Sequence, residues 1–273
     1  PTKTVYLKAT YENLTDTIME DIMENRNILK KDERIDQLYS QDVRIIQNPH
    51  YFAFSLDAVL LANFVRPNHR QKLKIVDLCA GNGAIGIFLH DKLSGTFTEV
   101  ELQPQIADMA ERTILLNDLQ DRYTVINDDI ANVNDYISKD SIDIVLCNPP
   151  YFPVTAQSQK NPNKALAIAR HEIATDLVTV VKKMSGLLKM NGHGYLVHRP
   201  DRLGEILQVC QENRLAPKRI QFIHPKPDRD ANILLLEVIK DGRPGGVKVV
   251  PPLIVHGADN EYTPAVQELL YGK

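Results

Sequence analysis

The sequence contains few cysteines and no long apolar run. Its three cysteines, Cys79, Cys147 and Cys210, are too few and too scattered for a disulfide framework or a zinc site, so we expect a reduced protein that holds no metal. The longest strongly apolar stretch, Ile233–Ile239, is interrupted by Glu237 and is far shorter than the roughly 18 residues of a membrane span. The given sequence does not begin with the charged segment and following apolar segment that are typical of a secretory signal peptide. These absences predict a cytoplasmic protein that does not enter membranes.

The composition is close to that of an average globular domain. Of the 273 residues, 43% are hydrophobic and 25% are charged, which excludes a disordered, collagen-like or low-complexity chain. At about 150 residues per domain, the length allows one large domain or two small ones. No repeat or flexible linker divides the chain, so we expect one main domain with a small N-terminal appendage.

The net charge of −3 conceals a difference between the two halves of the chain. Residues 1–150 hold 15 Lys and Arg against 23 Asp and Glu, a balance of −8, whereas residues 151–273 hold 17 against 12, a balance of +5. A positive working face would attract a polyanionic partner despite the acidic total. Ordinary surface charge explains the same numbers, so charge alone leaves the partner open.

The first part of the chain precedes the main domain. Apolar residues recur at helical spacing over Glu12–Lys31, which predicts an amphipathic helix. Two short β-like runs follow, Val43–Ile46 and Tyr51–Phe54, separated by residues typical of a turn, and we expect them to form a hairpin. Ser55 is predicted to cap a helix over Leu56–Val65.

From residue 73 onward, buried strands alternate with helices. We expect strands over residues 73–78, 97–101, 123–127, 142–147 and 194–198, and helices over residues 84–91, 104–116 and 175–188. Three further strands, over residues 219–223, 233–239 and 247–250, have no long helix between them. The turn at Gly242–Gly246 predicts that the last two form a hairpin. The pattern predicts an α/β fold with a mostly parallel sheet, helices on both faces and an antiparallel C-terminal edge.

A glycine-rich corner follows the first of these strands. Gly81–Gly86 matches the pattern G-x-G-x-x-G, and Glu101 lies 20 residues after Gly81, a spacing that fits a nicotinamide dinucleotide site. Asp77, four residues before the first glycine, favours a different ligand. Its carboxylate would repel a pyrophosphate and attract a ligand that bears an ammonium and a sulfonium, as S-adenosylmethionine does.

These residues form a predicted cofactor site at the carboxyl ends of three successive strands. Asp77 would face the amino-acid end of the cofactor, Gly81 and Gly83 would let the backbone approach it, and Glu101 would hold the ribose hydroxyls. Asp129 would accept from the adenine amino group, beside the backbone N–H of Ile130. The neighbours that complete the predicted site are Cys79, Ala80, Asn82, Leu102 and Asn148. The alternative is that the glycines only turn a tight corner and that Asp77 caps the following helix.

The segment Asn148-Pro-Pro-Tyr151 directly follows the fourth strand. Two prolines, Pro149 and Pro150, end the strand and fix the backbone, which exposes the Asn148 side-chain oxygen and the Pro149 carbonyl as rigid acceptors. Two accepted hydrogen bonds would hold the hydrogens of a planar amino group and direct its lone pair at a methyl donor. Tyr151 or Phe152 would stack on the plane that carries the amino group. An ordinary proline turn and a proline-rich recognition segment are the alternatives.

The two motifs together, over residues 76–86 and 148–151, resemble the class I S-adenosylmethionine-dependent amino-methyltransferases. The resemblance implies a Rossmann-like fold with a seven-stranded sheet, and Ser55 and Asp57 closing over the methionine end of the cofactor. Residues 54–62, 169–172, 198–203 and 217–226 are similar to the bacterial tRNA1(Val) (adenine-37-N6)-methyltransferase family, and the likeness covers approximately residues 34–250. That family implies methyl transfer to N6 of the adenine beside the anticodon.

The resemblance divides the chain into an N-terminal helical extension (residues 1–33), a hairpin and helix (34–66), a methyltransferase domain (67–255) and a C-terminal helix or tail (256–273). Its basic segments imply tRNA as the partner, with contacts from Phe152, Arg170, His171, Arg199, Arg202, Lys218, Arg219 and Lys226. A solvated charged surface, or a salt bridge at the start of a helix, explains part of this pattern equally well.

Other functions remain open from the sequence. The same motif occurs in enzymes that methylate a glutamine amide of release factors, and ribosomal RNA is another amino substrate. An NAD(P)-dependent oxidoreductase and a catalytically silent RNA-binding module are alternatives from other classes. Cys79 and Cys147 end neighbouring strands, and we expect them to lie close together as small buried thiols.

Overall fold

The computed structural model describes residues 28–51, 55–151 and 175–272. The predicted helix over Glu12–Lys31 lies, apart from its last residues, outside the described residues. The described chain begins with an antiparallel hairpin of β1 (Arg34–Leu38) and β2 (Val43–Gln47). The predicted pairing was therefore wrong for β2, which pairs with the strand before it. Tyr51 lies in a bend, and residues 52–54 are outside the described residues.

The main sheet contains seven longer strands and two short ones. The longer strands are β3 (Asn68–Leu78), β4 (Leu93–Glu101), β5 (Tyr123–Asn127), β6 (Ile142–Cys147), β7 (Leu188–His198), β8 (Leu215–His224) and β9 (Ile233–Lys240). Their order is β8-β9-β7-β6-β3-β4-β5, and β9 runs antiparallel to both of its neighbours while the other pairs are parallel. The predicted fold class is confirmed.

The C-terminal edge differs from the prediction. The short strands β10 (Lys248–Val249) and β11 (Leu253–Ile254) both pair with β8, and both run parallel to it. The predicted hairpin between the last two strands is therefore wrong. Because β9 already has β7 and β8 on its two sides, the chain after it must cross to the free edge of β8 to find backbone partners.

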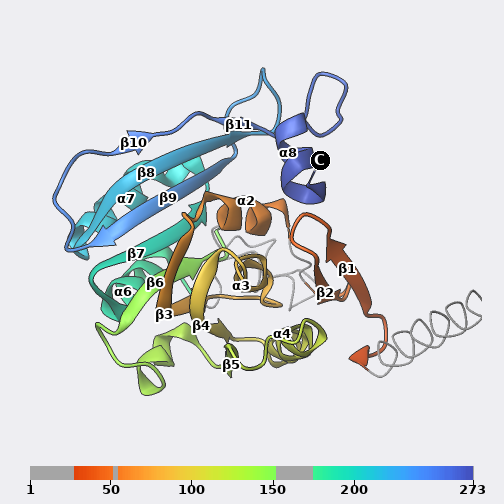
Figure 1. The fold of residues 1–273 in the computed structure, drawn as a ribbon. Coiled ribbons are helices and arrows are strands. Elements are labelled where there is room, and N and C mark those ends of the chain that lie inside the picture. The colour runs from red at the N-terminus through yellow and green to blue at the C-terminus, as the bar shows by residue number, and fades with distance from the viewer. Residues whose placement is uncertain (1–27, 52–54, 152–174, 273) are drawn as a thin grey trace, which may run out of the picture.

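Helices cover both faces of this sheet, as Figure 1 shows. The helices are α2 (Leu56–Phe64), α3 (Ala84–Phe88), α4 (Pro104–Leu116), α6 (Leu177–Leu187), α7 (Leu203–Glu212) and α8 (Pro264–Tyr271), with short 3-10 turns η1 (Ile130–Asp135) and η2 (Pro200–Arg202). Successive strand residues face opposite layers: Ile75 packs in the cluster with α2 and α3, and Val76 packs in the cluster with α6 and α7. The sheet is thus buried on both faces.

The centre of the sheet is the place where the chain changes direction. β3 and β6 are neighbours at the centre of the sheet. The chain continues from β3 to β4 on one side and from β6 to β7 on the other, so the connections that leave these two strands run in opposite directions. Ligands in open α/β sheets bind at the carboxyl ends of the strands beside such a point. The glycine corner after β3 and the Asn148-Pro-Pro-Tyr151 segment after β6 both lie there.

Candidate active site

A cavity lies at the carboxyl ends of the central strands. The space between its walls, counted out into the open mouth, is about 840 Å³. The predicted residues on its wall are Ser55, Cys79, Ala80, Gly81, Asn82, Glu101, Leu102, Asp129, Ile130, Asn148 and Pro150. The predicted residues that are not on this wall are Asp57, Asp77, Gly83, Pro149 and Tyr151. Residues from five separate predicted segments therefore meet around one cavity.

Two acidic residues contribute to the cavity wall. Glu101 ends β4, and its two carboxylate oxygens accept from the backbone N–H groups of Gly81 at 3.0 Å and Gln103 at 2.8 Å. Burial raises the pKa of Glu101, and these N–H donors oppose the shift. Asp129 follows β5 and accepts from the backbone N–H of Ala131 at 2.8 Å. Each carboxylate keeps further lone pairs for a ligand.

Asp77 lies away from the cavity wall, beside a second buried acid. Asp77 and Glu99 are 1% and 0% exposed, and their carboxyl groups contact each other. Burial, reinforced by the charge of Glu101, raises the pKa of Asp77 to about 8, and burial beside Asp77 raises the pKa of Glu99 well above its usual value. We expect the pair to hold at least one proton at neutral pH, because two touching carboxylates repel each other. The acids on the wall are therefore Glu101 and Asp129, and Asp77 lies behind it, contrary to the expectation that Asp77 faces the cofactor.

Glycine at position 86 makes room for this acid pair. A Cβ atom on Gly86 would lie 2.0 Å from Glu99 Oε1. The first glycine of the corner has a different role, because Gly81 has φ of +60°, a conformation that L side chains rarely adopt. The glycine pattern therefore serves both the turn and the packing behind it.

Two hydroxyl groups on the wall have no hydrogen-bond partner among the described residues. Ser55 Oγ and Thr175 Oγ1 are both buried, and both residues line the cavity. Ser55 is the N-cap residue of α2, as predicted, but its side chain makes no capping hydrogen bond. Thr175 was not predicted, and only its position just before α6 marks it in the sequence. Buried hydroxyls are normally paired, so these two are candidates for binding a polar ligand.

The Asn148-Pro-Pro-Tyr151 segment joins the cavity to α2. Asn148 and Pro150 line the cavity. The Tyr151 hydroxyl donates to Asp57 Oδ2 at 2.6 Å, and the ring of Tyr151 lies 5.8 Å from the ring of His198. Asp57, 8% exposed, therefore holds the tyrosine and does not face the cavity.

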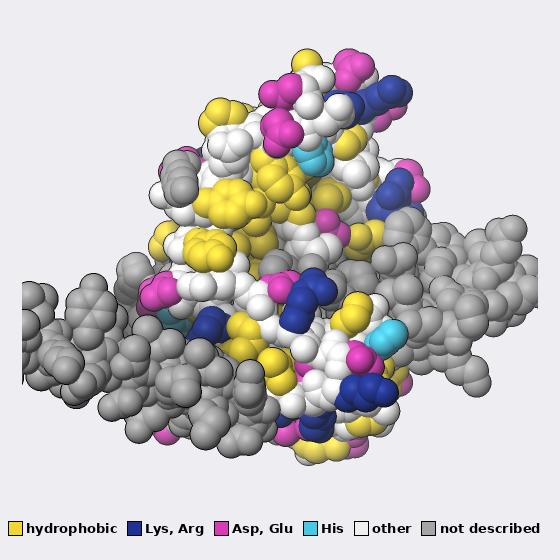
Figure 2. Space-filling model, turned by 90° about the vertical axis from the view of Figure 1, so that its right-hand side faces the viewer, with side chains coloured by type: hydrophobic (Ala, Val, Ile, Leu, Met, Phe, Trp, Pro, Cys, Tyr) yellow, Lys and Arg dark blue, Asp and Glu magenta, His cyan; other side chains and the backbone are white. Residues whose placement is uncertain are grey.

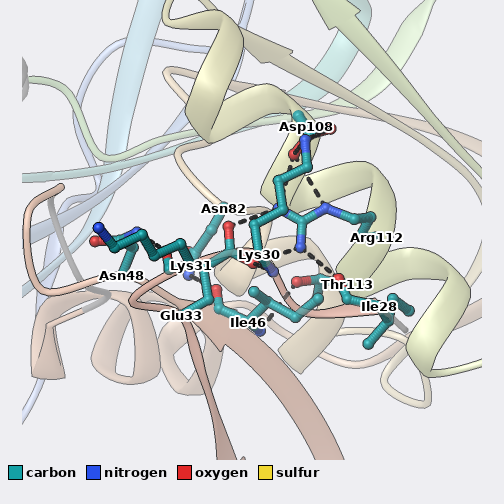
Figure 3. A network of polar contacts seen from close by, with 10 residues as sticks. All are labelled: Ile28, Lys30, Lys31, Glu33, Ile46, Asn48, Asn82, Asp108, Arg112 and Thr113. Atoms are coloured by element: carbon teal, nitrogen blue, oxygen red, sulfur yellow. Dashed lines mark hydrogen bonds and ion pairs between the residues drawn. The ribbon is translucent and has the colours of Figure 1, made fainter. Parts of the chain in front are cut away.

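The N-terminal hairpin is fastened to the cavity wall, as Figure 3 shows. The Asn82 side chain donates to the Ile46 carbonyl at 3.0 Å, and the Ile46 N–H donates to Thr113 Oγ1 at 3.1 Å. The predicted cofactor residue Asn82 thus lies on the wall while its amide nitrogen binds β2. The hairpin thereby connects the glycine corner to α4.

An ion-pair network holds the segment before this hairpin against α4. Arg112 makes a two-pronged contact with Glu33 at 2.6 and 2.7 Å and also binds Asp108 at 2.7 Å. Lys30 reaches the same Asp108 at 2.7 Å. The guanidinium of Arg112 is largely buried, so we expect this network to fix the position of the hairpin.

The predicted RNA-binding residues have different environments. Arg219 is largely buried: it binds Glu237 at 2.8 Å, contacts the Phe64 carbonyl, and lies 3.9 Å from the centre of the Phe64 ring. It stabilises the fold instead of facing a ligand, contrary to the prediction. Arg202, which pairs with Glu205, is about as buried as Arg219. The remaining basic residues have local partners but lie nearer to solvent, namely Arg199 with Asp201, Lys218 with two backbone carbonyls and Lys226 with Asn260. Phe152, Arg170 and His171 lie outside the described residues.

The face that bears the hairpin and α8 does not carry a charge of one sign. Figure 2 shows Lys and Arg side chains dispersed among Asp and Glu on this face. Nothing in this view supports a broad basic surface there.

Cys79 and Cys147 lie close together as predicted, but only Cys147 is buried, whereas Cys79 is half-buried on the cavity wall. Cys79 and Cys147 contact each other at the ends of β3 and β6, and burial together with Cys79 raises the pKa of the Cys147 thiol well above its usual value. All three cysteines are free thiols.

In the described part of the chain, no group of three or more His, Cys, Asp and Glu residues is arranged to hold a metal ion. Within the same residues, no helix is long and apolar enough to cross a membrane.

The fold is shared with solved methyltransferases. A predicted O-methyltransferase from Agrobacterium tumefaciens matches at 26% identity with a TM-score of 0.62, covering 79% of this chain and 96% of that one. Geranyl diphosphate C-methyltransferase from Streptomyces coelicolor, solved with Mg²⁺, geranyl diphosphate and S-adenosyl-L-homocysteine, shares the fold at 14% identity with a TM-score of 0.52, covering 68% of this chain and 77% of that one. Fold and cavity together define a class I methyltransferase.

The sequence comparison specifies the family. The chain belongs to the methyltransferase small domain family, whose sequence profile matches residues 54–190. A Porphyromonas gingivalis protein named tRNA1(Val) (adenine(37)-N6)-methyltransferase is 25% identical over 197 residues, which are 69% of this chain and 74% of that protein. The resemblance seen in the sequence is confirmed at the level of the family.

Proposed function

We propose that this chain transfers the methyl group of S-adenosylmethionine to N6 of an adenine in tRNA, at position 37 beside the anticodon. The observation that carries the proposal is the placement of Asn148-Pro-Pro-Tyr151, whose Asn148 and Pro150 share one cavity with the glycine corner and Glu101. A methyltransferase needs a donor site and a nucleophile site that open into each other. The name of the Porphyromonas gingivalis relative supports adenine 37 of tRNA as the substrate.

The polar groups on the wall fit S-adenosylmethionine. Glu101 has lone pairs available for the ribose hydroxyls, and Asp129 offers an acceptor for the adenine amino group. Ser55 Oγ and Thr175 Oγ1, which have no partner among the described residues, would donate to the carboxylate of the methionine end. When bound, the cofactor supplies a sulfonium-activated methyl group. We propose Thr175 as an addition to the predicted cofactor site.

The nucleophile is an amino nitrogen held by the Asn148 segment. The Asn148 side-chain oxygen and the Pro149 carbonyl would each accept one hydrogen of the adenine amino group, which leaves the nitrogen lone pair free to attack. Tyr151 would stack on the base, and its hydrogen bond to Asp57 fixes the ring from the far end. No strong base is required, because the proton is lost to water after the methyl group has been transferred.

The decisive first test separates RNA from protein as the methyl acceptor. The purified chain is incubated with S-adenosylmethionine labelled in the methyl group, together with a tRNA fraction and a protein fraction that are separated afterwards. We expect label in the tRNA. For Asn148→Ala we expect no label, while binding of S-adenosylhomocysteine by calorimetry stays unchanged. Label only in protein would contradict the tRNA proposal and favour glutamine methylation.

A thermal-shift experiment tests the class of cofactor independently of the acceptor. A ligand that binds only the folded state raises the melting temperature. We expect S-adenosylhomocysteine to raise it and NAD(P) to leave it unchanged. The reverse pattern would favour the oxidoreductase alternative.

A further inference from the structure

His198 is a buried histidine beside the Asn148-Pro-Pro-Tyr151 segment. It ends β7, which runs parallel to β6 with Leu196 opposite Cys147, so His198 and the segment after β6 emerge at the same edge of the sheet. The His198 side chain is 1% exposed, and its ring lies 5.8 Å from the ring of Tyr151 at an angle of 55°. The imidazole therefore adjoins the tyrosine on which the base is proposed to stack.

The hydrogen bond at Nδ1 fixes the tautomer of this imidazole. The backbone N–H of Arg199 donates to His198 Nδ1 at 2.8 Å, so in the neutral ring the hydrogen is on Nε2. Burial and the nearby charge of Arg202 lower the pKa of His198 to about 4, although Glu205 and Asp201 oppose the shift. The ring is therefore neutral at pH 7, with Nε2 as a hydrogen-bond donor.

This donor has no acceptor among the residues that the structure describes. His198 Nε2 is buried and unpaired, and buried donors are rarely left without a partner in the working state of a protein. Its place beside Tyr151 indicates that the missing partner arrives with the substrate. A ring nitrogen at the edge of a base stacked on Tyr151 is an acceptor of the required kind.

We propose that His198 determines base specificity by donating from Nε2 to a ring nitrogen that flanks the amino group of the target adenine. The proposal rests on the proposed function. In adenine the ring nitrogens on both sides of the amino group, N1 and N7, are acceptors. In guanine the Watson–Crick neighbour of the amino group is an N–H donor, and a glutamine amide has no ring nitrogen. Guanine N3, on the other side of that amino group, is an acceptor, so the donor selects against guanine when it reads the Watson–Crick neighbour of the amino group, which is N1 in adenine.

The experiment combines variants with altered substrates. Wild type, His198→Ala and His198→Gln are compared on a tRNA anticodon stem-loop that carries adenosine, 1-deazaadenosine or 7-deazaadenosine at the methylated position. Each analogue replaces one acceptor nitrogen by C–H and keeps the amino group. His256→Ala is the matched control, because His256 also lies against a tyrosine, at 5.0 Å from the ring of Tyr262, but follows β11 at the edge of the sheet and not β7 beside the Asn148 segment.

We expect His198→Ala to lower kcat/KM on adenosine by roughly 10- to 100-fold, the effect of losing one buried hydrogen bond. S-adenosylhomocysteine affinity should stay unchanged, and His198→Gln, which keeps an N–H donor, should recover part of the activity. One of the two deaza substrates should lower the kcat/KM of wild type by a similar factor and should not lower that of His198→Ala any further. The nitrogen that this analogue lacks is then the one that His198 contacts. His256→Ala should behave as wild type.

Two results would overturn the proposal in distinguishable ways. If wild type methylates the adenosine stem-loop but the loss in His198→Ala is equally large on all three substrates, His198 acts only through packing and the inference fails alone. If wild type methylates no adenosine in RNA and labels a protein instead, the proposed function fails and the inference fails with it.

Discussion

The unpaired hydroxyl of Thr175 gives a prediction in which stability and binding change in opposite directions. Valine is nearly the same size as threonine but replaces the hydroxyl with a methyl group. Because Thr175 Oγ1 is buried without a partner among the described residues, Thr175→Val should raise the free energy of unfolding of the ligand-free protein. A buried unpaired hydroxyl costs about 1–3 kcal/mol, and we expect a gain of about 1 kcal/mol.

The same variant should bind the cofactor product less tightly. If Thr175 donates to the methionine carboxylate, its loss removes a hydrogen bond to a charged group, worth about 1.5–3 kcal/mol. S-adenosylhomocysteine affinity should therefore fall roughly 10- to 150-fold. Urea denaturation measures the first quantity and isothermal titration calorimetry the second.

Thr113→Val is the matched control for this pair of measurements. Thr113 is fully buried and its hydroxyl accepts from the Ile46 N–H, so its replacement leaves a backbone donor unpaired and should lower stability by about 1–3 kcal/mol. Thr113 is not on the cavity wall, and S-adenosylhomocysteine affinity should not change. The reasoning about Thr175 is refuted if Thr175→Val loses stability as the control does, or if it binds S-adenosylhomocysteine as tightly as wild type.

Three further predictions follow from the buried polar groups. Burial and the charge of Glu101 raise the pKa of Asp77 to about 8 in the folded protein, so its contribution to stability is complete below the unfolded value near pH 4 and is lost as the pH rises through about 8. Asp77→Asn, which is neutral at every pH, should flatten this decline in urea titrations, and an unchanged pH profile would contradict it. Arg219→Ala should lower the free energy of unfolding by about 1–3 kcal/mol, because it removes one charged partner of the buried Glu237 carboxylate, which keeps Arg66 and His193; weaker tRNA binding at full stability would show instead that Arg219 is a ligand contact. Asp57→Ala should reduce kcat/KM for tRNA about tenfold by freeing the Tyr151 hydroxyl while leaving S-adenosylhomocysteine affinity unchanged, and a loss of that affinity would place Asp57 at the cofactor.

The elements that the sequence predicted best are those with strong local signals. Pro104 at the first helical position and an apolar run set the bounds of α4, and the short apolar run Ile142–Cys147 before two prolines sets those of β6. Both coincide with the structure. The convergence of the glycine corner, Glu101 and Asn148 on one cavity also followed from strand order, because parallel strands place their carboxyl ends at one edge.

Partners from distant segments explain what the sequence could not show. Arg219 was assigned to RNA because its charge is visible in the sequence, whereas its buried partner Glu237 is defined only by the pairing of β8 with β9. Asp57 binds Tyr151 across 94 positions of the chain. Asp77 was expected to face the cofactor, and only the packing of β3 against β4 reveals that its side chain meets Glu99. Local patterns indicate which residue types are present, and tertiary packing decides what they contact.

The most direct test of the proposed amino methylation is mass spectrometry of the product nucleosides. An unmodified tRNA1(Val) transcript is incubated with the protein and S-adenosylmethionine that carries a deuterated methyl group, then digested to fragments and nucleosides. The account predicts deuterated N6-methyladenosine at position 37 with wild type and none with Asn148→Ala. A methyl group on any other atom of the tRNA, or no methylated nucleoside from protein that binds S-adenosylhomocysteine normally, would contradict it.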